Sequence, residues 1–339
     1  MRYGKDVGSA IANAGQGVGG AQRAPRLAWL LIALLVAVGT PRLGLAADEV
    51  TVAADDDAGG GGDRTPLEIT GFVDGYYGYN FNHPPGVGYS TPLRNFDTKN
   101  NQLSLSLIEV ALEQKPTTGR RVGFRADLDF GPTTDLVHAA EPGGADVFKN
   151  FEQAYVSYLA PLGGGLQLDV GKFVTPLGAE VIEAKDNWNY SRSLLFALAI
   201  PYYHVGLRAA LPVGERLTLT GYLVNGWNNA VENNSRKTFG LSAALKPSDT
   251  LTLIQNVMTG PEQANDDSDR RLLADTVVTW NATPTLSLMA NYDYGRDEVA
   301  GQRVTWKGVA AYGRLQVTDS WALAPRVEWF RDEDGFMTG

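Results

Sequence analysis

Apolar and polar residues alternate with a period of two along most of the chain from Leu67 onward. In residues 121–130 the apolar positions are Val122, Phe124, Ala126, Leu128 and Phe130, and they alternate with Arg121, Gly123, Arg125, Asp127 and Asp129. Successive side chains of a β-strand point to opposite faces, so this pattern predicts strands with one apolar and one polar face. The polar face carries charges of both signs and the apolar face carries large aromatic residues, which favours a sheet between lipid and water.

The same alternation assigns faces in residues 205–211, 286–294 and 321–329. Pro325 interrupts the last of these segments because proline gives up a ladder hydrogen bond. The phase slips between Leu107 and Ile108, which predicts a β-bulge. We expect lipid-facing side chains at Phe124, Leu128, Leu207, Leu288 and Val327, and inward-facing ones at Arg125, Asp127, Arg208, Asn291 and Arg326. The inward positions include many Gly, Ala, Ser and Thr, which predicts a water-filled interior.

The connections between the predicted strands alternate between short and long. Short links lie at 115–119, 161–165, 212–215, 247–250, 283–285 and 318–320, and longer ones at 82–98, 131–149, 175–202, 226–236, 260–269 and 295–302. Outer-membrane barrels have short periplasmic turns and longer external loops. The pattern therefore predicts an all-β fold, a transmembrane antiparallel up-and-down β-barrel, with 131–149 and 175–202 at the same end.

The number of strands is odd. About thirteen are visible, whereas single-chain bacterial barrels normally have an even number. Residues 332–339 read as the start of another external loop. We therefore predict that the barrel, residues 67–339, is C-terminally incomplete and that a complete chain has about 14–16 strands, with a miscount as the alternative.

An export signal precedes the predicted barrel. Residues 27–38 form an unbroken apolar run behind Arg23 and Arg26, and small residues follow at 44–47. Twelve residues rise only ~18 Å as a helix, too short for a hydrocarbon core of ~30 Å. We predict a cleaved signal peptide with an over-long n-region at 1–46 and a flexible, acidic, Gly-rich leader at 47–66.

Composition and charge exclude several classes of function. The net charge is −9, which argues against a nucleic-acid partner because such a partner calls for a basic face. The only histidines are His83, His138 and His204, which give no metal-ligand spacing, and no Gly-x-Ser-x-Gly motif occurs. We therefore expect no enzymatic activity, no metal and no cofactor.

The middle of the chain resembles the OmpL-like β-barrel porin family. The residues that carry the likeness are 171–180 (GKFVTPLGAE), 189–193 (NYSRS), Pro201, His204, Gly206 and 225–228 (NGWN), with a diffuse likeness over roughly 67–331. The resemblance implies a Gram-negative outer-membrane barrel with porin activity and brings no catalytic residues. We expect the chain to lack the family's C-terminal end, which would be a departure from the family pattern.

The link at 175–202 is the longest and carries clustered charges of both signs. A long loop folded into the lumen places opposed charges across a constriction and filters solutes. The candidate pore residues are Lys172, Glu180, Glu183, Lys185, Asp186 and Arg192, together with Arg125, Asp127, Asp129 and His204 on the strands. Glu180 and Arg192 are expected to face Arg125 or Asp127 across open space. The alternative is an ordinary external loop, although the apolar run 194–200 predicts a short helix packed on the wall.

The expected partners are outer-membrane lipid, lipopolysaccharide and small hydrophilic solutes, with homo-oligomerisation left open. The predicted inward charges lean acidic, which predicts a mild preference for cations. Asp266, Asp267 and Asp269 read as a solvated acidic loop in preference to a site for a cation bridging lipopolysaccharide. Two other functions remain as alternatives, a structural or adhesive barrel without transport and, less favoured, a barrel-embedded hydrolase.

Overall fold

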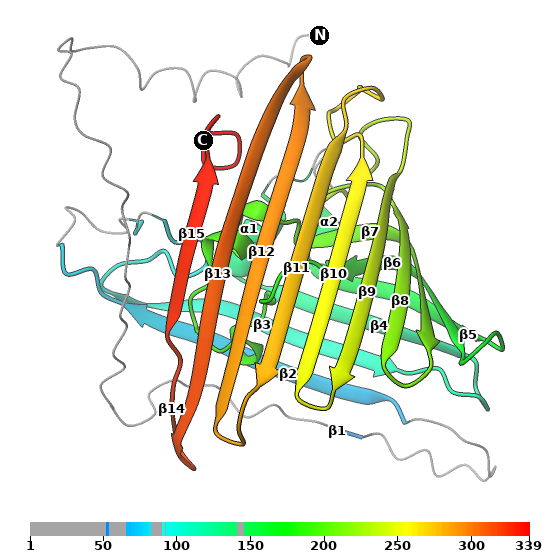
Figure 1. Ribbon diagram of the computed structural model, residues 1–339, viewed down its shortest axis with the longest axis horizontal. Coiled ribbons are helices and arrows are strands. Elements are labelled where there is room, and N and C mark those ends of the chain that lie inside the picture. The colour runs from blue at the N-terminus through cyan, green and yellow to red at the C-terminus, as the bar shows by residue number, and fades with distance from the viewer. Residues whose placement is uncertain (1–51, 54–65, 83–89, 92, 140, 142–145) are drawn as a thin grey trace. The chain divides into compact units, whose positions relative to one another are not determined.

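The computed structural model describes residues 52–53, 66–82, 90–91, 93–139, 141 and 146–339. The predicted signal peptide, most of the predicted leader and His83 lie outside the described residues. The described strands form one antiparallel sheet (Figure 1). They are β1 (Val52–Ala53), β2 (Glu68–Gly78), β3 (Gln102–Gln114), β4 (Val122–Phe130), β5 (Phe151–Ala160), β6 (Leu166–Val174), β7 (Tyr203–Val213), β8 (Leu217–Val224), β9 (Thr238–Ser248), β10 (Leu251–Gly260), β11 (Arg271–Asn281), β12 (Leu286–Val299), β13 (Gln302–Thr318), β14 (Trp321–Leu323) and β15 (Arg326–Asp332).

Among the described residues, four short helices lie in the connections. They are α1 (Pro132–Val137), α2 (Asp146–Lys149), the 3₁₀ helix η1 (Ala184–Asp186) and the π-helix η2 (Leu195–Ala199). No helix among the described residues is long and apolar enough to span a membrane.

Each strand pairs with its neighbours in chain order, which is the predicted up-and-down topology. Strands β14 and β15 both pair with β13, one after the other, and Pro325 lies between them. They therefore act as one strand interrupted where proline cannot donate to the ladder. Counted as one, β14 and β15 add a thirteenth long strand to the twelve strands β2–β13. The described residues therefore form thirteen long strands, as predicted. The two-residue strand β1, which lies in the segment predicted as a leader, pairs with β2.

The predicted short links all connect consecutive strands, and the link at 175–202 runs without change from the end of β6 to the start of β7. The long link predicted at 295–302 is wrong. Strand β12 continues to Val299 and β13 begins at Gln302, so only Ala300 and Gly301 lie between them. Both have positive φ, 51° and 76°, as in a type I′ hairpin turn. The charged residues in this stretch belong to paired strands, where Asp297 binds Arg271 of β11 at 2.7 Å.

The predicted faces of the sheet are confirmed. Phe124, Leu288 and Val327 are exposed, whereas Asp127 and Asn291 are buried on the opposite face, which we call the inner face. Ion pairs lie on this face. Arg125 binds Asp127 at 2.8 Å, and Arg208 of β7 binds Asp169 of β6 at 2.7 Å. Pairing of opposite charges explains how adjacent positions can carry both signs.

The sequence predicts a water-filled interior lined by many small residues, but the inner face also carries large apolar side chains. A buried apolar cluster lies on it and includes Phe173, Tyr203 and Trp306 from the strands, with Leu177 and Leu195 from the connection 175–202. These large side chains escaped the sequence analysis because they occur one at a time among small residues. The interior is therefore partly filled at the level of this connection.

Candidate functional site

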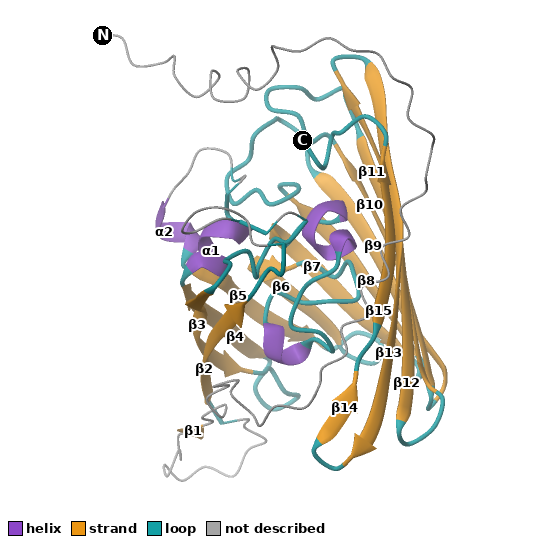
Figure 2. Cartoon of the chain, turned by 90° about the vertical axis from the view of Figure 1, so that its left-hand side faces the viewer, coloured by secondary structure: helices purple, strands orange, loops and turns teal. Residues whose placement is uncertain are grey.

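The connection 175–202 begins and ends at one point of the sheet and folds back along the inner face. Val174 pairs with Tyr203 in the ladder, and the Thr175 N–H donates to the Tyr202 carbonyl at 2.9 Å. Figure 2 shows loops and short helices between strands β2–β6 and strands β12–β15. The connection contacts β2 of the first group and β15 of the second, and it therefore lies against the inner face.

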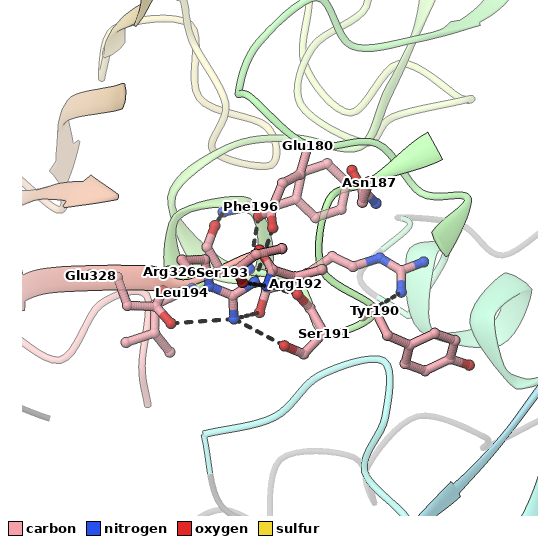
Figure 3. A network of polar contacts seen from close by, with 12 residues as sticks. Glu180, Asn187, Tyr190, Ser191, Arg192, Ser193, Leu194, Phe196, Arg326 and Glu328 are labelled. Atoms are coloured by element: carbon pink, nitrogen blue, oxygen red, sulfur yellow. Dashed lines mark hydrogen bonds and ion pairs between the residues drawn. The ribbon is translucent and has the colours of Figure 1, made fainter. Parts of the chain in front are cut away.

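A buried ion pair joins the connection to β15 (Figure 3). Arg326 of β15 binds Glu180 at 3.1 Å and donates to the carbonyl of Ser191 and, at 3.1 Å, to that of Arg192. Glu180 also accepts a hydrogen bond from the Ser193 N–H at 2.8 Å. Both charged side chains are buried, so the pair is compensated by surrounding hydrogen bonds as a buried ion pair requires.

Two further contacts reach opposite ends of the sheet. The Leu194 N–H donates to the carboxylate of Glu328 on β15 at 2.5 Å. The Tyr190 hydroxyl donates to the Asp74 carboxylate on β2 at 3.0 Å. Strand β2 is near the start of the ladder and β15 is at its end. The connection therefore bridges the first and last long strands across the interior.

The apolar run at 194–200 forms the helix that the sequence predicted, as η2. Leu195 is fully buried, and the Trp306 indole N–H of β13 donates to the Ala199 carbonyl at 3.0 Å. A side chain at Gly308 of β13 would lie 2.7 Å from a methyl group of Leu195. The absence of a Cβ at Gly308 thus allows η2 to approach the strand closely.

Glu183, in the first half of the connection, joins a group of acidic side chains on the inner face. One carboxylate oxygen each from Glu109 (β3), Glu152 (β5) and Glu183 lies within 4.8 Å of the others. Asp127 and Asp129 of β4 are close enough to act on this group electrostatically. Burial and the nearby Asp186 and Asp127 carboxylates raise the pKa of Glu183, which opposes the effect of Lys185.

Glu109 and Glu152 are not among the candidate residues identified from the sequence, and both lie on strands with a β-bulge. The register of β2 against β3 jumps from Leu107 to Leu105 and leaves Ser106 unpaired. This confirms the predicted irregularity, at the residue that precedes Leu107. The register of β4 against β5 jumps from Gln153 to Phe151 and leaves Glu152 unpaired. Alternation with Val156 and Tyr158 assigns Glu152 to the lipid face, and the bulge re-aims it inward. Beyond the predicted phase slip, Glu109 alternates with Ile108 and Val110, which agrees with its inward position. The phase slip at 107–108 was the one available signal.

Lys172 of β6 lies beside His138, at the end of α1. The His138 Nδ1 lies 2.8 Å from the Thr134 carbonyl and must donate to it, so Nε2 accepts from the Lys172 ammonium at 2.6 Å. Lys172 also donates to the Phe148 carbonyl at 3.1 Å and lies over the Tyr203 ring. Burial, reinforced by the Lys172 charge, lowers the pKa of His138 to about 4.

The remaining candidates have different surroundings. Arg192 is buried, donates to the Tyr190 carbonyl at 2.8 Å and stacks on the Phe96 ring instead of facing Arg125 or Asp127. Lys185 and Asp186 are exposed and pair with each other at 2.8 Å.

Glu180 likewise pairs with Arg326 and not across open space. His204 is fully buried, where Nδ1 donates to the Gly226 carbonyl and Nε2 accepts from the Thr175 hydroxyl at 3.1 Å.

A family model describes the chain from residue 66 to residue 339 as "Putative beta-barrel porin-2, OmpL-like". The match covers all of the long strands and the connection 175–202. The chain belongs to this porin family. It is therefore a porin-type β-barrel of the bacterial outer membrane, and the inner face of the sheet is the face of its lumen.

Solved outer-membrane proteins show a distant likeness. A loop L8 deletion mutant of OmpT from Vibrio cholerae matches 68% of this chain and 76% of its own, with 10% identity and a TM-score of 0.46. The outer membrane channel DcaP of Acinetobacter baumannii matches 78% and 96%, with 11% identity and a TM-score of 0.36. No curated protein matches the chain. The assignment depends on the family model.

Proposed function

We propose that this porin passes small hydrophilic solutes and ions by passive diffusion, and that the connection 175–202 forms its constriction. The observation that supports this proposal is the double attachment of the connection, through Tyr190 to Asp74 on β2 and through Glu180 to Arg326 on β15. A segment held at both sides narrows the lumen, because solutes must pass beside it.

The charges at this level support a preference for cations. Five carboxylates gather on the β3–β5 side, from Glu109, Asp127, Asp129, Glu152 and Glu183. Three positive groups act on them, Arg125, Lys172 and Lys185. Charges in a narrow, weakly screened passage act more strongly on a passing ion than charges at an open rim. The acidic excess therefore favours the passage of cations at a pH where these carboxyl groups are ionised.

Buried candidates act by positioning. His204 accepts a hydrogen bond from the Thr175 hydroxyl and so holds the start of the connection in place. Arg192 holds the connection together through the carbonyls of Tyr190 and Ile182. Arg125, Lys185 and Asp186 retain exposed surface, and they are the groups that we propose to meet solutes directly.

The test is conductance of the purified full-length protein in a planar lipid bilayer. We expect discrete conductance steps and a reversal potential on the cation side in a salt gradient. A variant in which residues 178–200 are replaced by a short Gly-Ser linker should conduct more per channel and lose most of the preference. A matched control shortens the connection 225–237 between β8 and β9.

Unchanged single-channel conductance in the first variant would refute the constriction. Absence of conductance in a folded wild-type protein would refute the channel and favour a structural or adhesive barrel. We also propose that protomers assemble in the membrane, as in the distantly similar OmpT structure from Vibrio cholerae that is described as a trimer form. The oligomeric state is therefore measured in the same experiments.

A further inference from the structure

Glu109, Glu152 and Glu183 bring three carboxylates together from segments far apart in the chain. Glu109 comes from β3, Glu152 from β5 and Glu183 from the connection 175–202. One oxygen of each lies within 4.8 Å of the others. Oxygens that bind one Ca²⁺ ion at 2.3–2.6 Å are at most ~5 Å apart. The three oxygens are therefore spaced as ligands of a single ion.

The hydrogen bonding of these carboxylates is a second, independent observation. Glu152 is only 2% exposed, yet neither of its carboxylate oxygens has a hydrogen-bond partner among the described residues. Within the same part of the chain, one oxygen each of the buried Glu109 and Asp129 also has none. A buried carboxylate without a partner carries a large desolvation penalty. A bound cation would satisfy these oxygens and offset the repulsion among them.

From this arrangement we infer that Glu109, Glu152 and Glu183 bind a divalent cation of the Ca²⁺ type. Ca²⁺ takes six to eight oxygen ligands in flexible geometry, so carboxylates and water suit it. Mg²⁺ demands a tighter octahedron, and Zn²⁺ prefers nitrogen or sulfur ligands. Of the neighbouring cations, Lys172 is directed to His138 and the Phe148 carbonyl, and Lys185 pairs with Asp186. The cluster thus consists of hard oxygen ligands alone.

The ion would join the connection to the wall. Contacts of Glu180 and Tyr190 attach the connection to β15 and β2, and the ion would attach Glu183 to β3 and β5. Binding to the folded state alone stabilises a protein in proportion to the logarithm of the free ion concentration. The inference goes beyond the proposed function, since cation binding and its effect on stability do not require solute passage.

The experiment uses the full-length protein in detergent, treated with EDTA and then dialysed. CaCl₂ or MgCl₂ is added, and the unfolding temperature and the binding stoichiometry are measured by thermal unfolding and calorimetry. We expect Ca²⁺ to raise the unfolding temperature progressively and to bind at one site per chain, with a smaller effect of Mg²⁺. No effect of Ca²⁺ on the wild-type protein would overturn the inference.

Two variants locate the site. Glu183→Gln changes the connection only and should weaken Ca²⁺ binding at least about tenfold, since ligand charge tunes affinity. Glu152→Gln should do the same and should raise the unfolding temperature in EDTA, because it removes one of the repelling charges. The control is Asp266→Asn with Asp267→Asn, in the acidic connection between β10 and β11, which should leave Ca²⁺ binding unchanged. Equal binding by Glu183→Gln and wild type, or loss of binding in the control, would overturn the inference.

Discussion

Arg326 of β15 forms a buried ion pair with Glu180, 146 residues earlier in the chain, at 3.1 Å. Removing one partner of such a pair leaves an uncompensated buried charge, which costs ~3–5 kcal/mol. We therefore expect Arg326→Met to destabilise the barrel by about that amount and to increase single-channel conductance by freeing the connection. Denaturant unfolding and bilayer recordings measure the two effects. Arg314→Met on β13, where the arginine is exposed, is the control and should change neither.

Gly308 on β13 determines how closely η2 packs. Its missing Cβ leaves room for Leu195, and a Cβ there would also lie 2.8 Å from the Trp329 carbonyl. We expect Gly308→Val to displace η2 and to destabilise the protein by ~1–3 kcal/mol, as overpacking does. Adding Leu195→Ala should recover part of the loss. If the double variant is no more stable than Gly308→Val, the contact does not limit the packing.

Asp127 on β4 balances Arg125, which keeps part of its surface in the lumen. Asp127→Asn should leave that positive charge uncompensated and shift the reversal potential toward anions. Recording in EDTA keeps any bound divalent cation out of the comparison. Asp267→Asn, in the connection between β10 and β11, should have little effect because its charge lies in an exposed loop. Equal shifts in the two variants would contradict a constriction near Asp127.

The cost of an arginine substitution on the lipid face should depend on how deep the position lies in the bilayer. Leu288 is the third residue of β12, beside the turn to β11, whereas Val309 lies in the middle of β13 and pairs with Tyr292. Val309→Arg should cost ~2–4 kcal/mol and Leu288→Arg only ~0–1 kcal/mol, the values for the bilayer midplane and the interface. Urea unfolding in lipid vesicles compares them. A larger cost at Leu288 would contradict this placement of the strands.

His138 should make stability depend on pH below neutrality. Its pKa is about 4 in the folded protein against an ordinary value near 6.5, because burial and Lys172 disfavour the charged ring. The unfolded chain therefore takes up a proton first as pH falls. The stabilisation is complete above pH ~6.5 and is lost progressively between pH ~6.5 and ~4. The unfolding temperature of His138→Gln should fall less over this window than that of the wild type.

The sequence alone determined the strands and their faces. Side-chain direction alternates strictly along a strand, so Phe124 and Val327 could be assigned to lipid and Asn291 to the interior without knowledge of any neighbour. The break at Pro325 and the helix within 194–200 were also predictable, because both depend on local chemistry. The turn at Ala300 and Gly301 was not, since charged residues on both sides resembled a loop.

Only the tertiary structure decided which groups meet in the interior. Arg326 contacts Glu180, and Tyr190 contacts Asp74, because the connection folds back across the sheet. Alternation determines the face of a residue but not its partner. Glu109 and Glu152 meet Glu183 because bulges in two strands change the register between distant segments. A register shift of one residue moves a side chain to the other face. The phase slip near Leu107 signalled the bulge in β3, whereas the bulge at Glu152 depends on strand pairing across the sheet and left no signal in the local sequence.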